Sequence, residues 1–368
     1  MVYMGAIAMA GRKRARDYGL ATWRLSSGPL GAITDVPGVR VGHSTVIRGE
    51  RMRTGATAIF AHDGDPFHER VFAGVDVLNG DTVNTGQAII DEWGLLCSPV
   101  VFASTRSLGV AYEAVVQHFI SRYPEASADG NLIPVVMECD DNYLSDNRSF
   151  PLQVEDVLAC LQSAQGGPVE EGGVGAGTGM QLFGWKGGIG TASRVVTAYG
   201  QTYTIGVILN TNFGQRQQLL LRGFPIGEHL ADPLAGRSPE GSCVGVLATD
   251  APLGPSQLRR MAKRVGFGLV RCGSVGNDGS GEAFIAFSTA HRVRRDHSSP
   301  VTVQRLIEGQ FWQRGSPIDL LFEAATEASE EACLNALVAG TTTTGRDGHA
   351  LHGFPVEEAL GVLRQNAL

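Results

Sequence analysis

The chain has 368 residues and a formal net charge of −7 at pH 7, with 43% hydrophobic and 18% charged residues. This length allows a large buried core. The acidic balance argues against nucleic acid as a partner, because phosphate binding needs a basic surface. The sequence contains no run of about eighteen apolar residues, so no membrane span is expected.

Glycine and cysteine usage narrows the class of protein further. The 49 glycines, well above the usual ~7%, predict many tight turns and close backbone approaches. The six cysteines are scattered without CxxC pairs, which predicts buried free thiols in a reducing, cytoplasmic compartment.

The N-terminal residues predict no secretory signal and no nucleic-acid site. Charged residues follow the mildly apolar residues 1–11 instead of preceding them, the reverse of a secretory signal. The basic cluster at 12–16 is interpreted as a solvated N-terminal arm, because short basic motifs are common by chance.

The first half of the chain contains signals for strands and helices. Residues 33–46 predict two short strands around a turn, and residues 55–61 predict another strand. Apolar residues at helical spacing predict a helix over 108–122. The continuous apolar run 132–137 predicts a buried strand that leads directly into Glu138.

The second half alternates strands and helices more clearly. Residues 166–190 are rich in glycine without helical period, and residues 215–241 predict an irregular, exposed loop. Strands are expected over 194–198, 203–209, 243–249 and 283–288, and helices over 153–164, 255–271, 318–338 and 355–363. With strands concentrated in mid-chain and helices on the flanks, the pattern predicts helical layers around packed sheets in one domain.

The glycine run at 172–180 is not a nucleotide-binding motif. Its glycines fall at alternate positions, so it lacks a GxGxxG fingerprint, and the later Lys186 lacks the context of a phosphate loop. Alternating glycines remove side chains from one face of an extended segment and leave backbone open to a neighbouring chain or a ligand. A structural role and a binding role are equally compatible with this pattern.

The bond between Gly241 and Ser242 is a candidate for self-cleavage. Ser242 opens an apolar, strand-like run and follows glycine, the least obstructive residue. Cleavage would leave Ser242 with a hydroxyl nucleophile and an α-amine of pKa ~7.7–8.0 on one residue. One residue would then supply both nucleophile and base.

Polar side chains lie beside several of the predicted strands. Glu138 follows one strand and could bind an ammonium group, and Asn212 follows another, where its amide could stabilise an oxyanion. Ser280 and Glu282 precede a third strand and point to the same side of an extended segment. Taken singly, each is more often an ordinary loop residue, and none of the nine histidines is assigned a role.

Taken together, these segments resemble the self-processing L-aminopeptidase/D-amidase-esterases and the related β-peptidyl aminopeptidases. The resemblance covers nearly the whole chain. It is carried by the openings at 14–19 and 32–39, the strand 134–138, the glycine run with 186–194, Gly241-Ser242 with 248–253, and 279–282 with 285–290.

The resemblance implies an α+β fold, a four-layer αββα sandwich in a single domain, cleaved into chains 1–241 and 242–368 that assemble as tetramers of two-chain units. It implies Ser242 as nucleophile, Asn212 as oxyanion amide, Ser280 and Glu282 as groups that tune Ser242, and Glu138 as anchor for the substrate amine. The substrates would be short peptides, amides or esters, hydrolysed without a metal or organic cofactor.

Two segments depart from the family pattern and put specificity in question. They are Cys139-Asp140-Asp141 and Ser104-Thr105-Arg106-Ser107. Two alternative functions stay open. One is a self-cleaving acyltransferase of the ornithine acetyltransferase type, which the serine at the cut disfavours. The other is an uncleaved, non-enzymatic binding protein.

Overall fold

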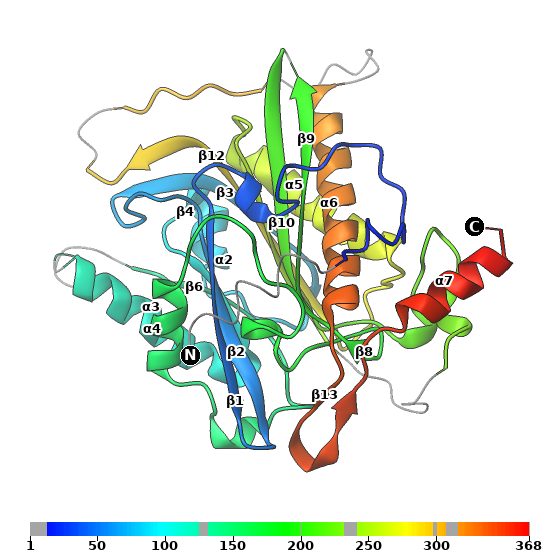
Figure 1. The fold of residues 1–368 in the computed structure, drawn as a ribbon. Helices are drawn as coiled ribbons and strands as arrows, with labels where there is room; N and C mark the ends of the chain where they lie inside the picture. Colours follow the sequence, from blue (N-terminus) through cyan, green and yellow to red (C-terminus); the bar gives the residue numbers. More distant parts are fainter. Residues whose placement is uncertain are drawn as a thin grey trace.

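The computed structural model describes residues 13–123, 125, 132–198, 200–231, 241–296, 300–306 and 316–367. Two main sheets form the centre (Figure 1). The larger has the strand order β4-β3-β12-β11-β10-β9 and the smaller the order β1-β2-β5-β6. Their pairings are antiparallel except for β11 with β12 and β5 with β6, which are parallel.

The strands of the larger sheet are β3 (Glu69–Gly80), β4 (Leu95–Leu96), β9 (Gly188–Ala198), β10 (Gln201–Thr211), β11 (Cys243–Thr249) and β12 (Gly281–Arg294). Those of the smaller sheet are β1 (Arg40–Arg48), β2 (Met52–Phe60), β5 (Val100–Ser104) and β6 (Val135–Cys139). Two small hairpins pair β7 (Gln181–Leu182) with β8 (Trp185–Lys186), and β13 (Thr343–Thr344) with β14 (Ala350–Leu351).

Within the described ranges, six helices are seven residues long or longer. They are α2 (Gln87–Trp93), α3 (Leu108–Arg122), α4 (Val154–Gln162), α5 (Pro255–Arg271), α6 (Pro317–Ala339) and α7 (Val356–Gln365). Short 3-10 turns are η1 (Ile33–Asp35), η2 (Thr105–Ser107), η4 (Asn147–Ser149), η5 (Gly175–Gly177), η6 (Arg216–Gln218), η7 (Ile226–Glu228) and η8 (Arg346–Gly348).

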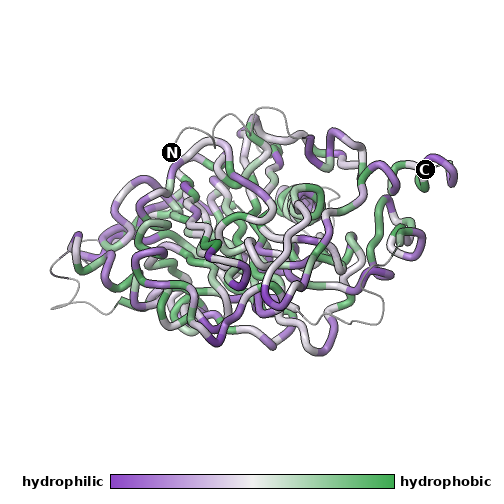
Figure 2. The backbone as a smooth tube through the Cα atoms, turned by 60° about the horizontal axis from the view of Figure 1, so that its bottom comes forward, coloured by the Kyte–Doolittle hydropathy of each residue, from purple (hydrophilic) through white to green (hydrophobic). Residues whose placement is uncertain are grey.

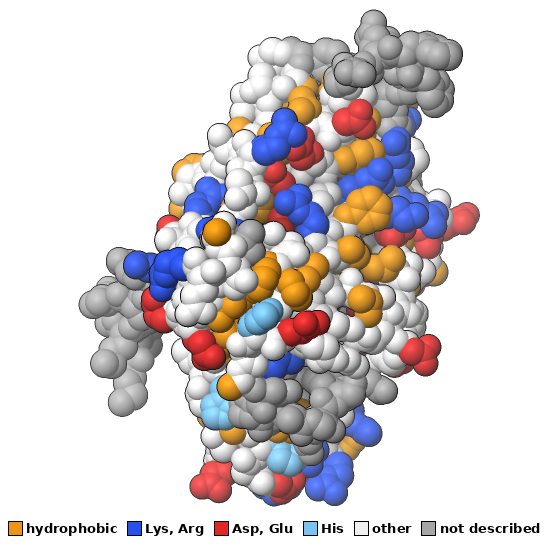
Figure 3. Space-filling model, turned by 90° about the vertical axis from the view of Figure 1, so that its right-hand side faces the viewer, with side chains coloured by type: hydrophobic (Ala, Val, Ile, Leu, Met, Phe, Trp, Pro, Cys, Tyr) orange, Lys and Arg blue, Asp and Glu red, His pale blue; other side chains and the backbone are white. Residues whose placement is uncertain are grey.

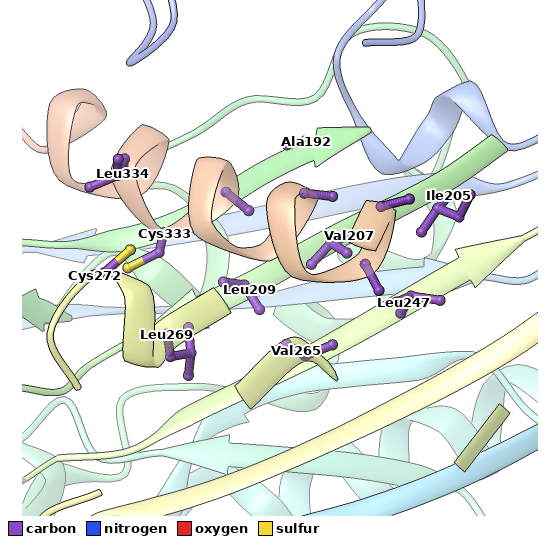
Figure 4. Packing of buried hydrophobic residues seen from close by; sticks show 14 of the residues in the cluster. Ala192, Ile205, Val207, Leu209, Leu247, Val265, Leu269, Cys272, Cys333 and Leu334 are labelled. Carbon is purple, nitrogen blue, oxygen red and sulfur yellow. The ribbon is translucent and has the colours of Figure 1, made fainter. Parts of the chain in front are cut away.

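Three hydrophobic clusters define the layers of the molecule. The first fills the space between the larger sheet and helices α5 and α6, where Val207, Leu209 and Leu247 meet Val265 and Leu269 (Figure 4). The second lies between the two sheets. The third lies between the smaller sheet and α3 with α4. The order is therefore helix, sheet, sheet, helix, as the αββα expectation states.

The outside of the molecule is mixed in polarity. Along the backbone, hydrophobic segments run through the middle and hydrophilic segments lie mostly toward the outside (Figure 2). On the face shown in Figure 3, small groups of hydrophobic side chains lie among basic and acidic ones. None of the helices in the described parts of the chain combines the length and hydropathy needed to cross a membrane.

Several expectations about the elements were wrong. The two strands expected within 33–46 are the 3-10 turn η1 followed by the single strand β1. Strand β9 begins at Gly188, inside the glycine-rich segment. Strands β3 and β5 were not expected, so strands are not confined to mid-chain. The strand β3 is interrupted by a glycine and ends in exposed residues, which weakens its alternating pattern.

The basic cluster near the N-terminus is not a solvated arm. Arg12 lies outside the described residues, but Arg14 pairs with Glu171 at 2.9 Å and Arg16 pairs with Glu331 of α6 at 2.8 Å. Glu331 is buried and the side chain of Glu171 is 13% exposed, and a carboxylate shielded from water needs a partner. The two arginines therefore fasten the N-terminal segment to the body of the protein.

Candidate active site

The register of the strands brings the ends of three neighbouring strands, β10, β11 and β12, together at one end of the larger sheet. Thr211, the last residue of β10, pairs with Cys243, the first residue of β11. Cys243 also pairs with Glu282 at the start of the parallel strand β12. Asn212, Ser242 and Ser280 each lie one or two residues beyond these paired positions. Segments that are far apart in sequence therefore meet at this end of the sheet.

The backbone at the Gly241–Ser242 bond is held against Asn212. The backbone N–H of Asn212 donates a hydrogen bond to the Ser242 carbonyl at 2.9 Å. A Cβ atom added to Gly241 would lie 1.8 Å from the Asn212 carbonyl oxygen and 3.1 Å from its Nδ2. The approach is possible because residue 241 has no side chain.

The side-chain amide of Asn212 is fixed in one orientation. Its Oδ1 accepts the backbone N–H of Gln181 at 3.0 Å, and its Nδ2 donates to the Asp140 carbonyl at 2.8 Å. Since a primary amide nitrogen has two N–H donors, one donor stays available near Gly241. Preorganised donors of this kind can stabilise an oxyanion without reorganising during the reaction.

Ser280 and Glu282 form a buried pair on the strand beside Ser242. The Ser280 hydroxyl donates a short hydrogen bond to Glu282 Oε1, and both residues are almost fully buried. Burial raises the pKa of Glu282 above the ordinary carboxyl value, opposed by hydrogen bonds from Ser280 and Asn79. A carboxyl group with a raised pKa is suited to proton transfer nearer neutral pH.

Ser242 is 7% exposed. In the uncleaved chain its hydroxyl makes no hydrogen bond to any other residue that the structure describes. The register places Ser242 next to the Ser280–Glu282 pair along the backbone, and no direct bond joins their side chains.

Glu138 lies at the end of β6 in the smaller sheet. Its Oε1 accepts the backbone N–H of Val83 at 2.9 Å, and its Oε2 accepts a short hydrogen bond from the Thr105 hydroxyl. Burial raises the pKa of Glu138, opposed by these hydrogen bonds. Thr82, next to Val83 in the chain, packs against Gly281, which lies between Ser280 and Glu282. A Cβ atom on Gly281 would lie 2.6 Å from Thr82 Cβ.

The two segments that depart from the family pattern lie around Glu138. Thr105 holds the Glu138 carboxylate, and Ser104 donates to Asp141 Oδ1 at 2.8 Å. Asp141 is buried, which raises its pKa to about 6. Cys139, in contrast, belongs to the apolar cluster between the sheets. The departures therefore change the polar surroundings of Glu138, and the segment 139–141 also contacts Asn212 through the Asp140 carbonyl.

Sequence reasoning missed the backbone groups that hold Asn212 and Glu138. The Gln181 N–H, the Asp140 carbonyl and the Val83 N–H carry no signal in residue type. In the sequence, Thr105 stands out only as part of a segment that departs from the family pattern. Among the residues the structure describes, no cluster of three or more His, Cys, Asp or Glu side chains could hold a metal ion.

The glycine run packs closely against other backbone, as one of its two interpretations predicts. At its start, a Cβ atom on Gly172 would lie 2.4 Å from the carbonyl oxygen of Ala339, the last residue of α6. The run also contacts the smaller sheet, where the Gly175 N–H donates to Thr45 Oγ1 at 2.8 Å. It therefore lies between the two sheets and α6.

Comparison with known proteins identifies the family. Residues 31–351 match the model of peptidase family S58, and the chain belongs to this family of peptide-hydrolysing enzymes. It is 38% identical to the beta-peptidyl aminopeptidase BapA of Sphingosinicella microcystinivorans, covering 99% of this chain and 95% of that protein.

Two solved structures are similar over nearly the whole chain. A beta-aminopeptidase from Burkholderia sp. superimposes with a TM-score of 0.87 at 39% identity, and the L-aminopeptidase D-Ala-esterase/amidase from Ochrobactrum anthropi with a TM-score of 0.88 at 38% identity. Each match covers 96% of this chain and 99% of the other. The second is described as a variant of the Ntn hydrolase fold, so this chain has that fold.

Proposed function

We propose that the protein is a self-processing serine aminopeptidase and amidase that cleaves its own Gly241–Ser242 bond and then releases N-terminal residues from short peptides, amides or esters. The observation that carries this proposal is the packing of Gly241 and Ser242 against Asn212, whose backbone and side chain both face this bond. Family membership favours hydrolysis over acyl transfer or simple binding.

Maturation begins with attack of the Ser242 hydroxyl on the Gly241 carbonyl carbon. The C–N bond breaks as the nitrogen takes the hydroxyl proton, which leaves an ester between Gly241 and Ser242 Oγ. Water then hydrolyses the ester, giving a Gly241 carboxylate and a free Ser242 α-amine. The Asn212 Nδ2–H would stabilise the oxyanion, a donor whose loss typically costs ~10²–10³ in rate.

In the mature enzyme the same hydroxyl attacks the first amide bond of a substrate. Its proton goes to the Ser242 α-amine, or to Glu282 through Ser280, and is passed to the leaving amine. The acyl-enzyme ester is then hydrolysed. Glu138 binds the free amine of the substrate by a charge-assisted hydrogen bond, and Thr105 holds its carboxylate in place.

Intact mass and denaturing electrophoresis test this proposal. The purified protein is expected to contain chains of 241 and 127 residues, and Ser242→Ala is expected to abolish both cutting and hydrolysis of aminoacyl anilides. An uncleaved wild-type chain that still hydrolyses amides would overturn the mechanism. Anilides with α-, β- and D-residues would define which position of the substrate amine Glu138 accepts.

The proposed assembly is a tetramer of two-chain units in a reducing, cytoplasmic compartment. All six cysteines are free thiols, which supports the compartment. Apolar side chains are exposed on β3 and α5, among them Leu78, Phe267 and Val270. They support an interface between units at these two elements, because large apolar patches often mark contacts between proteins. Light scattering on the purified protein tests the tetramer, and a mass of one unit would exclude it.

A further inference from the structure

Lys186 is a fully buried lysine inside the glycine-rich loop formed by residues 172–187, here named the glycine loop. Its Nζ donates hydrogen bonds of 2.8 Å to the carbonyls of Gly177 and Gly187. Within the described part of the chain, no carboxylate forms an ion pair with it. A buried ammonium without a counter-charge is costly, so this position calls for an explanation.

The glycine loop leaves room for the lysine side chain. A Cβ atom on Gly173 would lie 3.4 Å from both Cε and Nζ of Lys186. Burial lowers the pKa of Lys186 to about 7. A neutral amine keeps two N–H donors, so both hydrogen bonds to the loop carbonyls can persist when the proton is lost.

The bonds of Lys186 hold a closed turn that leads to Asn212. The Met180 N–H donates to the Gly177 carbonyl at 3.3 Å, and the Gly187 N–H donates to the Met180 carbonyl at 3.1 Å. Gln181 pairs directly with Lys186 in the β7–β8 hairpin. The next bond in this path is from the Gln181 N–H to Asn212 Oδ1, at 3.0 Å.

We propose that Lys186 is a positioning residue for the Asn212 amide. It ties the two ends of the turn together, and the turn presents the Gln181 N–H that fixes Asn212 Oδ1. With Oδ1 held there, Nδ2 faces Gly241. This inference rests on the proposed function and gives the glycine loop a role in it, because Gly177 and Gly187 supply the carbonyls that bind the lysine.

Lys186→Met, which keeps the length of the side chain but removes the donors, tests this role. We expect kcat for an aminoacyl anilide to fall about 10- to 100-fold, less than the ~10²–10³ that outright loss of an oxyanion donor costs, with KM changed less than twofold. Self-cleavage is expected to slow by a similar factor. Lys186→Gln, which keeps N–H donors, is expected to recover part of kcat, and it carries the test if the methionine variant does not fold.

Thr178→Val is the matched control, because Thr178 lies in the same loop and its hydroxyl donates to the Gly175 carbonyl at 2.6 Å, away from the path to Gln181. We expect its kcat to stay within twofold of wild type. If Thr178→Val loses as much kcat as Lys186→Met for an equal loss of Tm, general loosening of the loop explains the effect and the proposal fails.

A double-mutant cycle with Asn212→Ala gives the decisive readout. If Lys186 acts through Asn212, adding Lys186→Met to Asn212→Ala lowers kcat by less than twofold more. Losses that multiply would overturn the proposal, as would a folded Lys186→Met enzyme with wild-type kcat. A wild-type protein without cleavage or hydrolysis would instead refute the proposed function, so the two failures are distinguishable.

Discussion

Gly241 controls how close the scissile bond can come to Asn212. Any side chain there would meet the Asn212 carbonyl, since even a Cβ atom would lie 1.8 Å from it. We predict that Gly241→Ala slows self-cleavage at least tenfold, because the backbone must shift away from the amide. Time-resolved electrophoresis of freshly translated protein measures this rate.

The Gly241→Ala molecules that do cleave themselves should have wild-type kcat, because residue 241 is then the C-terminal residue of the large chain and is no longer bonded to Ser242. Gly109→Ala is the control for the substitution itself, since its Cβ atom would meet open space. Cleavage of Gly241→Ala at the rate of Gly109→Ala would contradict the steric argument.

Protonation of Glu282 is expected to cause the fall of kcat at low pH, the acidic limb of the pH profile. Burial raises its pKa, and only the carboxylate form can accept a proton, so kcat should fall as pH drops through a value above the ordinary ~4.3. We predict that Glu282→Gln lowers kcat by about 10² or more and removes this limb from the pH profile.

Glu330→Gln is the matched control for Glu282→Gln. Glu330 is also buried, and burial raises its pKa as well, but it lies on α6 and pairs with Arg271 at 2.9 Å. Its substitution should leave the acidic limb in place. An unchanged limb in Glu282→Gln would assign the titration to another group, the Ser242 α-amine foremost.

At the scale of elements, the sequence predicts those with strong local patterns. The apolar spacing of Leu258, Met261 and Val265 predicts helix α5, and all three are buried against the sheet. Strand β3 escapes prediction because its partner β12 lies some 200 residues away in the chain, and local pattern carries no information about that pairing.

The same limit applies to the candidate site. Ser242, Ser280 and Glu282 could be selected from their positions at strand ends and from the family resemblance, but their proximity depends on the register of β10, β11 and β12. The bond from Gln181 to Asn212 uses a backbone N–H, which every residue except proline offers. Only the folded arrangement of the glycine loop selects Gln181.

Lys186 makes the stability of this loop depend on pH. Its folded pKa of about 7 is lower than the ordinary ~10.4. Its destabilising effect is therefore complete below pH 7 and is lost as pH rises toward 10, because the unfolded chain then binds a proton that the folded chain does not.

We predict that the unfolding free energy of the wild-type sequence rises relative to Lys186→Met between pH 7 and 9.5, by up to about 1.4 kcal/mol per pH unit. Urea unfolding in the Ser242→Ala background, where the chain stays single, measures this difference. A difference independent of pH would mean that Lys186 keeps an ordinary pKa in the folded protein.

At the scale of the whole molecule, cleavage at Gly241–Ser242 would divide the larger sheet between two chains. Strands β11 and β12 would belong to the small chain, and they lie between β10 and β3 of the large chain. The small chain would also contribute α5 and α6, which cover that sheet. Each chain alone would expose an unpaired strand edge and much of the shared core.

We therefore predict that the two chains stay together after cleavage and unfold as one unit. Gel filtration with light scattering should give one species containing both chains in equal amounts, at the elution volume of uncleaved Ser242→Ala, and calorimetry should show one transition. In guanidinium chloride the chains should separate, because only the peptide bond would have joined them covalently. A free 127-residue chain in native buffer would show that the shared sheet does not hold them.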